Sequence, residues 1–169
     1  MRRLALLPLL LLTSSCGDLL ALHTLQLPSD RVTEPALEGR WENDNMAFTV
    51  QPSAGLYYVH LVGKRDPSEP RDYHVRLVEL NGVRFADLLW TEALGHMVAR
   101  LTVSGAELRV AFWDSKWLRD RVPHEEADVN NNAKQSVLTA PTARLRALVS
   151  QYAKDPRAYD PQELVFHRR

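Results

Sequence analysis

The sequence predicts a mainly β domain: an antiparallel up-and-down meander or barrel with one C-terminal helix and a closing strand. Three observations carry this prediction. Between residues 46 and 113, apolar and polar side chains alternate with the period of two that is typical of strands. Short turns that contain glycine separate these stretches. Near the C-terminus, one stretch has helical apolar spacing, and a last alternating stretch follows it.

Composition limits the classes of protein that the chain can belong to. Of its 169 residues, 45% are hydrophobic, which indicates one globular domain rather than a disordered chain. Lys plus Arg and Asp plus Glu are equal at 21 each, so the basic surface typical of nucleic-acid binding is not expected. The single cysteine, Cys16, excludes an intrachain disulfide.

The first 15 residues are predicted to be a secretory signal peptide. Arg2 and Arg3 give a positive start, residues 4–12 are almost wholly apolar, and small polar residues 13–15 follow. The apolar run is too short to cross a bilayer as a helix. Cys16 therefore stands where cleavage is expected.

Leu12-Thr13-Ser14-Ser15-Cys16 resembles the lipobox of bacterial lipoprotein signals. The resemblance implies that Cys16 carries diacylglycerol, becomes the first residue of the mature chain and is acylated with a fatty acid such as palmitate on its new amino group. Gly17 follows where an aspartate would imply inner-membrane retention, so the implied location is the outer membrane, facing the periplasm. The alternative is an ordinary signal peptide with a chance cysteine nearby.

The mature chain is predicted to have two parts. Residues 16–36, with Pro28 and Pro35, are expected to be a tether that docks partly on the domain. Residues 37–169 are expected to form the β domain.

About six strands are predicted before Trp113. Asn81-Gly82 is a strong hairpin signal because both residues tolerate positive φ, and Ser104-Gly105 is expected to be another two-residue turn. Residues 64–71 are expected to be a polar turn. The alternation places four sets of apolar residues on common strand faces: Tyr57, Val59 and Leu61; Tyr73, Val75 and Leu77; Met97, Ala99, Leu101 and Val103; and Leu108, Val110 and Phe112.

The pattern changes after Trp113. Asp114 is a good N-cap for a short helix that ends by Pro123. Residues 124–134 are polar and predicted to be a loop, and residues 136–140 a short strand. A helix is predicted over about 142–152, with residues 163–169 as the closing strand beside the first one. The helix has one apolar stripe, formed by Leu145, Leu148, Val149 and Tyr152.

From Leu37 to Arg169 the chain resembles a group of uncharacterised bacterial lipoproteins. The resemblance rests on Leu37-Glu38-Gly39-Arg40-Trp41, the hairpin of residues 77–88, Trp117-Leu118 and residues 138–146. The glycine two residues before Trp41, followed by a meander, a helix and a last strand, is similar to lipocalin-like barrels. The resemblance implies a lipocalin-like fold and an envelope location, and it carries no activity.

The candidate metal ligands are few. His124-Glu125-Glu126 with Asp128 lacks the second histidine of a His-Glu-x-x-His site, so a solvated loop is expected there. Three histidines in predicted strands could meet on one barrel face, although packing or exposure is the stronger expectation for them: His60, His74 and His96. We expect neither a metal nor a cofactor.

Other candidates are isolated. Asp87 lies between apolar neighbours and is expected to bind turn amides or an arginine such as Arg100. Ser104-Gly105-Ala106 does not match the Gly-x-Ser-x-Gly turn of a serine nucleophile. Four tryptophans are expected to pack in the core or at the barrel ends, with the alternative that some line a ligand cavity: Trp41, Trp90, Trp113 and Trp117.

The sequence therefore favours a non-catalytic, lipid-anchored envelope protein that binds a small apolar ligand or a protein partner. The alternative is an envelope enzyme whose site is not recognisable from sequence. The interior of the barrel distinguishes them. A cavity lined by Trp and Tyr favours a binding protein, and a cleft with converging carboxylates and histidines favours catalysis, whereas a fully packed barrel favours a structural or partner-binding role.

Overall fold

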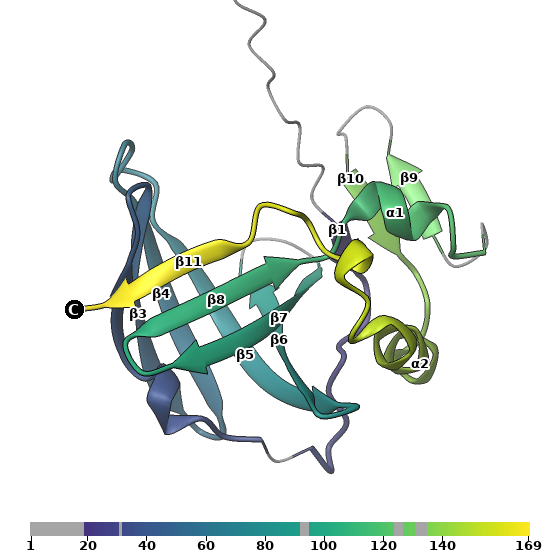
Figure 1. Ribbon diagram of the computed structural model, residues 1–169, viewed down its shortest axis with the longest axis horizontal. Coiled ribbons are helices and arrows are strands. Elements are labelled where there is room, and N and C mark those ends of the chain that lie inside the picture. The colour runs from purple at the N-terminus through teal and green to yellow at the C-terminus, as the bar shows by residue number, and fades with distance from the viewer. Residues whose placement is uncertain (1–18, 31, 92–94, 124–126, 131–134) are drawn as a thin grey trace, which may run out of the picture.

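The computed structural model describes residues 19–30, 32–91, 95–123, 127–130 and 135–169, and it confirms the mainly β fold. Eight antiparallel strands form a closed barrel (Figure 1). They are β2 (Gly39–Glu42), β3 (Met46–Ser53), β4 (Leu56–Gly63), β5 (Arg71–Leu80), β6 (Val83–Trp90), β7 (His96–Ser104), β8 (Glu107–Phe112) and β11 (Leu164–Arg168).

The barrel closes through its last strand. Strands β2 to β8 pair with their sequence neighbours, and β11 lies between β8 and β2. Leu164 is opposite Val110 on β8, and His167 is opposite Glu42 on β2. The predicted closing strand beside the first barrel strand is confirmed, and closure leaves none of the eight strands as an open edge.

One predicted hairpin is confirmed and another is shifted. Asn81 and Gly82 both have positive φ, +53° and +72°, as a tight turn between β5 and β6 requires. The second turn is formed by Gly105 and Ala106 rather than by Ser104 and Gly105, because Ser104 still pairs with Glu107. Gly105, at φ +58°, occupies the first central position, where glycine is favoured.

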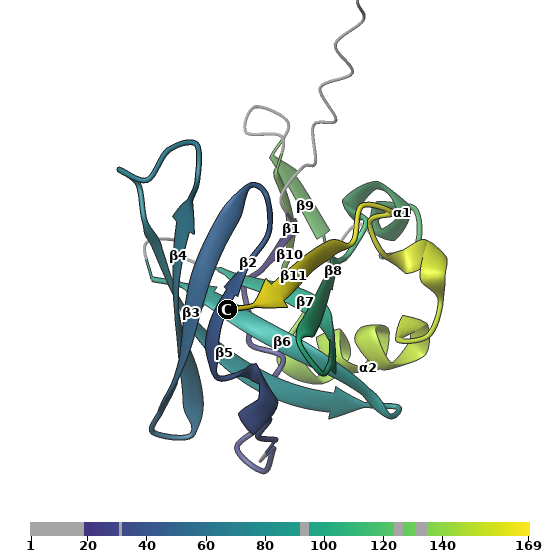
Figure 2. The ribbon, with the colours of Figure 1, turned by 60° about the vertical axis from the view of Figure 1, so that its left-hand side comes forward.

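Three further strands extend the sheet beside β7 (Figure 2). Strand β1 (Leu19–Ala21) pairs with β7 and runs parallel to β10 (Gln135–Leu138), and β10 pairs with β9 (Ala127–Asn130). The predicted loop over residues 124–134 is therefore wrong at residues 127–130. Backbone pairing with β10 forms that strand, and it needs no apolar periodicity. Residues 124–126 and 131–134 lie outside the described residues.

The packed part of the chain begins at Leu19, within the segment predicted to be a tether. Ala21 pairs with His96 of β7, and Leu25 is completely buried. Val32 forms a bridge with Leu77, and a 3-10 helix, η1 (Pro35–Leu37), follows. The described residues between 19 and 37 thus contribute to the core of the domain.

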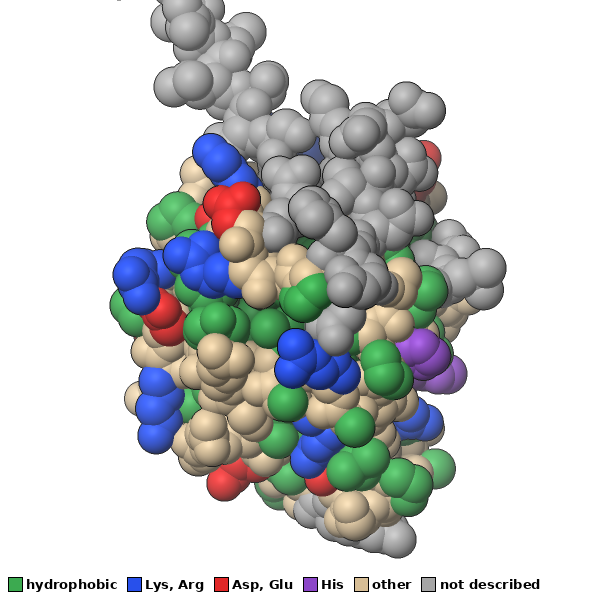
Figure 3. Space-filling view, turned by 90° about the vertical axis from the view of Figure 1, so that its right-hand side faces the viewer, with side chains coloured by type: hydrophobic (Ala, Val, Ile, Leu, Met, Phe, Trp, Pro, Cys, Tyr) green, Lys and Arg blue, Asp and Glu red, His purple; other side chains and the backbone are tan. Residues whose placement is uncertain are grey.

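The barrel wall is packed on both of its faces. One hydrophobic core lies inside the barrel, and the other lies between the wall and the elements beside it, which are at the right in Figure 1. These elements are α1 (Ser115–Arg119), α2 (Thr142–Tyr152) and η3 (Pro156–Ala158). Figure 3 shows this side of the molecule, where lysine and arginine side chains are spread out rather than gathered in one patch.

Both predicted helices are confirmed. Asp114 caps α1, since its Oδ1 accepts a hydrogen bond from the Trp117 amide at 2.8 Å. Helix α2 spans the predicted residues 142–152 and buries Leu145 and Val149 against the outer core. Leu148 is only partly buried, so the inner side of α2 is centred on Leu145 and Val149.

One end of the barrel is closed by η1 and by Arg168 of the last strand. The Arg168 guanidinium lies over the Trp41 ring, 4.5 Å from its centroid, and donates to the Glu38 carbonyl at 2.6 Å and to the Ala36 carbonyl. Trp41 Nε1 donates to the Leu37 carbonyl at 2.7 Å. These contacts hold the residues of the Leu37–Trp41 motif together.

Gly39 is needed at this end for two reasons. Its φ is +117°, and a Cβ built there would lie 3.0 Å from Arg168 Nη1. Gly39→Ala should therefore destabilise the fold by about 1–3 kcal/mol through backbone strain, and by more if Arg168 is displaced. The measurement is the free energy of unfolding in urea.

Gly55→Ala is the matched control. Gly55 also has positive φ, +85°, but nothing lies within 4 Å of its built Cβ. Gly55→Ala should lower the free energy of unfolding by about 1–2 kcal/mol, through backbone strain alone. Equal costs for the two variants would contradict a role for Gly39 in seating Arg168.

Candidate ligand-binding cavity

The interior of the barrel contains a cavity of about 360 Å³. It is lined by Leu37 of η1 and by inward-facing residues from β3 to β8 and β11. Side chains alternate between the two faces of a strand, so every second residue of these strands faces inward. Most residues of the four predicted apolar sets lie on this inner face, including Tyr57, Val59 and Leu61.

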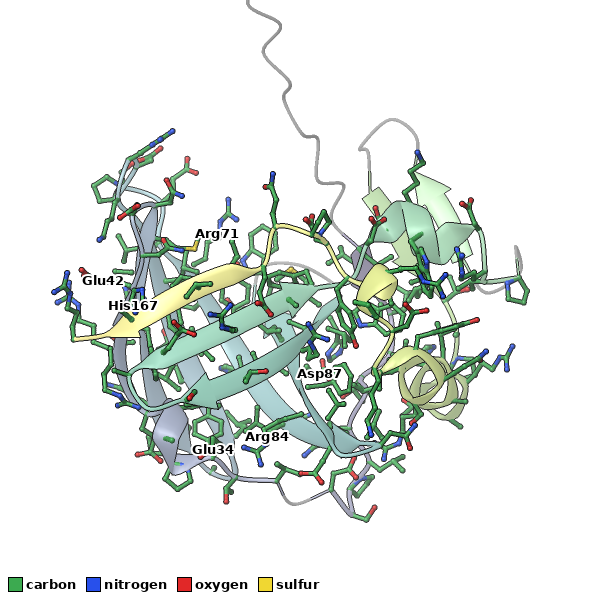
Figure 4. All side chains as sticks on the ribbon, viewed as in Figure 1. Glu34, Glu42, Arg71, Arg84, Asp87 and His167 are labelled. Carbon is green, nitrogen blue, oxygen red and sulfur yellow. The ribbon has the colours of Figure 1, made fainter. Side chains whose placement is uncertain are left out.

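The cavity has a closed floor and an open mouth. Leu37 and Tyr57 line it near the floor, where the Tyr57 hydroxyl accepts a hydrogen bond from the Glu34 amide at 2.7 Å. We use mouth for the opposite end of the barrel, where β3, β5, β7 and β11 begin. Arg71, the first residue of β5, both lines the cavity and is exposed, so the cavity reaches the surface there. Figure 4 shows Arg71 and Glu34 at opposite ends.

Nearly all of the cavity lining is apolar. Among the nineteen lining residues, only Arg71 is charged, and none is an aspartate, glutamate, histidine, serine or cysteine. Five lining residues are aromatic: Phe48, Tyr57, Tyr73, Phe112 and Phe166. The lining matches an apolar ligand well. It contains no pair of carboxylate or histidine side chains that could act as general acid and base.

None of the four tryptophans lines this cavity, so the alternative prediction that some of them do is wrong here. Trp41 is fully buried beside the floor, and Trp90 lies at the mouth next to Arg71. Trp113 and Trp117 belong to the outer core, where they make edge contacts with Tyr159 and Tyr152. Their predicted role in the core and at the barrel ends is confirmed.

The three histidines do not meet. His60 and His74 are exposed on the outside of the barrel, and His96 lies on β7 beside Asp87. Over the residues that the structure describes, no group of three or more His, Cys, Asp or Glu side chains could hold a metal ion. His124, Glu125 and Glu126 are outside those residues, as is the side chain of Asp128.

His60 has a local carboxylate partner instead. Its Nδ1 lies 2.7 Å from Asp72 Oδ1. Hydrogen bonds from Tyr58 and then from His60 lower the pKa of the Asp72 carboxyl below its ordinary value. This exposed group lies outside the barrel, where it cannot serve the cavity.

The buried side chain of Asp87 binds the N-terminal segment, the described residues between 19 and 37, and holds it on the barrel wall. It is 2% exposed, and its Oδ2 accepts hydrogen bonds from the Leu25 amide at 2.8 Å and from the Thr24 hydroxyl. Its Oδ1 lies 2.7 Å from His96 Nδ1. Asp87 thus binds a backbone amide in a bend of the chain, as one of the two expectations had it, whereas Arg100 as its partner is wrong. Arg100 instead lies over the Tyr159 ring, 4.2 Å from its centroid.

Helix α2 holds the same segment from the other side. The Thr142 hydroxyl donates to the Thr24 carbonyl at 2.8 Å. Arg146 donates to the Leu25 carbonyl at 2.9 Å and forms an ion pair with Asp30 at 2.6 Å. Sequence reasoning could not identify these contacts, because the partners lie more than 100 residues apart.

Asp87→Asn should weaken the hold of the barrel wall on residues 24 and 25. The amide has no charge and only one acceptor oxygen in place of two, so its hydrogen bonds with Leu25, Thr24 and His96 are weaker than those of the carboxylate. We expect a loss of about 1–3 kcal/mol in the free energy of unfolding. We also expect faster hydrogen exchange at the Leu25 amide.

Asp72→Asn is the control, since Asp72 also contacts a histidine at 2.7 Å but is exposed. Its effect should stay within about 0.5 kcal/mol. If Asp87→Asn were no more destabilising than Asp72→Asn, the charged hydrogen bonds of the buried Asp87 side chain would contribute nothing to stability.

No family model matches the chain, and neither a curated protein nor a solved structure matches it. Among the described residues, no helix is both long enough and apolar enough to span a membrane.

Proposed function

We propose that this chain is a lipid-anchored protein of the cell envelope that binds a small apolar ligand inside its barrel, without catalysing a reaction. The observation that carries the binding role is the apolar cavity of about 360 Å³, closed by η1 and open at Arg71. Cavities of about 300–1,000 Å³ with mostly apolar walls are typical of small-molecule sites. Water inside such a wall lacks polar partners, so an apolar ligand displaces it favourably.

The anchor is proposed from the sequence alone. Leu12–Cys16 has the pattern of a lipobox, and lipid on Cys16 would hold the chain to the outer membrane. Two residues, Gly17 and Asp18, separate Cys16 from Leu19. Three extended residue spacings reach about 11 Å at most.

This short spacing would place the mouth of the barrel close to the membrane. Leu20 lies against Gly95, just before β7, since a Cβ built on Gly95 would be 3.3 Å from that of Leu20. Ala21 pairs with His96, the first residue of β7, at the mouth. An anchored chain would therefore exchange its ligand within a short distance of the bilayer surface.

The binding proposal is tested by filling the cavity. Leu88 lines it, whereas its neighbour Leu89 is on the outer face of β6. The probe is N-phenyl-1-naphthylamine, a neutral apolar dye whose fluorescence rises in apolar surroundings. Leu88→Trp should weaken dye binding at least about tenfold by occupying the space, and Leu89→Trp should leave it unchanged.

Circular dichroism and thermal unfolding check that both variants keep the fold. The proposal fails if the parent protein does not bind the dye. It also fails if folded Leu88→Trp and Leu89→Trp proteins bind it equally well.

The anchor is tested by Cys16→Ser and cell fractionation. Without the thiol no diacylglycerol can be attached, so the variant should leave the membrane fraction. The parent should stay there through high salt and carbonate washes. A Cys16→Ser protein that remains membrane-bound through the same washes would show that lipid on Cys16 is not the anchor.

A further inference from the structure

Along the cavity wall of the described chain one residue is charged, and it lies at the mouth. Arg71 begins β5, and Tyr73 and Val75, which follow on the same face of that strand, also line the cavity. No other lining residue is charged, from the mouth to Leu37 at the floor. A ligand inside the barrel therefore meets a cation only where it enters.

This cation has no carboxylate partner among the described residues. Two carboxylates near the same end pair with other cations, Glu42 with Lys64 and Arg169 and Asp72 with His60, and no ion pair joins Asp44, Asp66 or Glu69 to Arg71. Arg71 contacts Trp90 instead, with its guanidinium carbon 5.4 Å from the ring centroid. This cation–π contact supports the guanidinium at the mouth and leaves its N–H donors available.

We propose that the ligand is an amphiphile whose apolar tail fills the cavity and whose anionic head group, a carboxylate or a phosphate, binds Arg71. This inference rests on the proposed function, because it assigns a ligand class to the same cavity. The planar guanidinium matches both head groups with two parallel hydrogen bonds. The head group cannot be accommodated at the floor, since no charged residue lines the cavity there and the Arg168 guanidinium is bound to the Glu38 and Ala36 carbonyls.

The polarity of the lining decides the orientation of the ligand. The tail contacts only apolar and aromatic side chains, whereas the head group stays at the exposed end beside Arg71. A cationic head group is disfavoured there by like charge, and a neutral one gains no charge-assisted hydrogen bond. The site therefore discriminates by head-group charge among ligands with the same tail.

The test is displacement of bound N-phenyl-1-naphthylamine by four ligands with one twelve-carbon chain: dodecanoate, dodecyl phosphate, dodecanol and dodecylamine. Both anions should bind about tenfold more tightly than dodecanol, and dodecylamine no more tightly than dodecanol. A preference between the two anions identifies the source, a free fatty acid or a phosphate-bearing lipid. The preference for anions should shrink as salt is added, because the head-group site is exposed.

Arg71→Gln removes the charge and should abolish the tenfold preference of the anions over dodecanol, with every affinity measured by displacement of the dye from that same variant. Arg71→Lys keeps the charge without the planar fork and should retain about a threefold preference. Arg65→Gln is the control, since Arg65 is an exposed arginine of the β4–β5 loop that does not line the cavity. It should behave as the parent does.

The outcomes separate this inference from the proposed function. If the parent binds the dye but dodecanol competes as well as the anions, the cavity is a ligand site and the head-group assignment is wrong. The assignment is also wrong if Arg71→Gln keeps the preference for anions, or if it loses the dye and the anions by the same factor. If the parent binds no dye at all, the proposed function itself fails.

Discussion

The contact between Arg168 and Trp41 is the constraint on which the barrel depends. It joins the last strand to the first, because Arg168 pairs with Trp41 across the β11–β2 ladder and covers its ring. The same guanidinium binds the carbonyls of Ala36 and Glu38 and so secures η1 over the floor. The Arg168 side chain therefore takes part both in closing the sheet and in closing the floor of the cavity.

The barrel wall serves two cores because both of its faces are apolar over β5 to β8. Phe85 is completely buried outside the barrel, and its neighbour Ala86 is buried inside it. The outer core needs cover, which α2 and the N-terminal segment provide. The Asp87 carboxylate binds the Leu25 amide of that segment, and Arg146 of α2 binds the Leu25 carbonyl.

This arrangement leaves the interior available to a ligand. The packing that orders the helices lies outside the wall, so the helices need not enter the barrel to bury their apolar side chains. The cavity is shaped by strand side chains and Leu37 alone. The lining is apolar and Arg71 stands at the mouth, so the shape of the tail and the charge of the head group become separate determinants of binding.

The N-terminal segment connects the two proposals in space. Its strand β1 ends beside the start of β7, at the mouth, and the segment then runs along the outer wall to Asp87. Lipid on Cys16 would therefore act on the end of the barrel where Arg71 lies. A ligand drawn from the bilayer would meet the guanidinium before it meets the apolar interior.

The sequence by itself determined the local elements. The alternation of apolar and polar residues predicted the strands, and Asn81-Gly82 predicted the hairpin. Asp114 predicted the start of α1, and the apolar stripe predicted α2. Such features depend on neighbours within a few residues, so they can be read along the chain. Only the tertiary structure decided that Leu25 belongs to the core and that Asp87 binds the Leu25 amide. It also decided that residues 127–130 pair with β10 and that a cavity remains inside the barrel. The physical reason is that burial and hydrogen-bond partners come from segments distant in sequence. The volume left empty depends on how all inward side chains fit together.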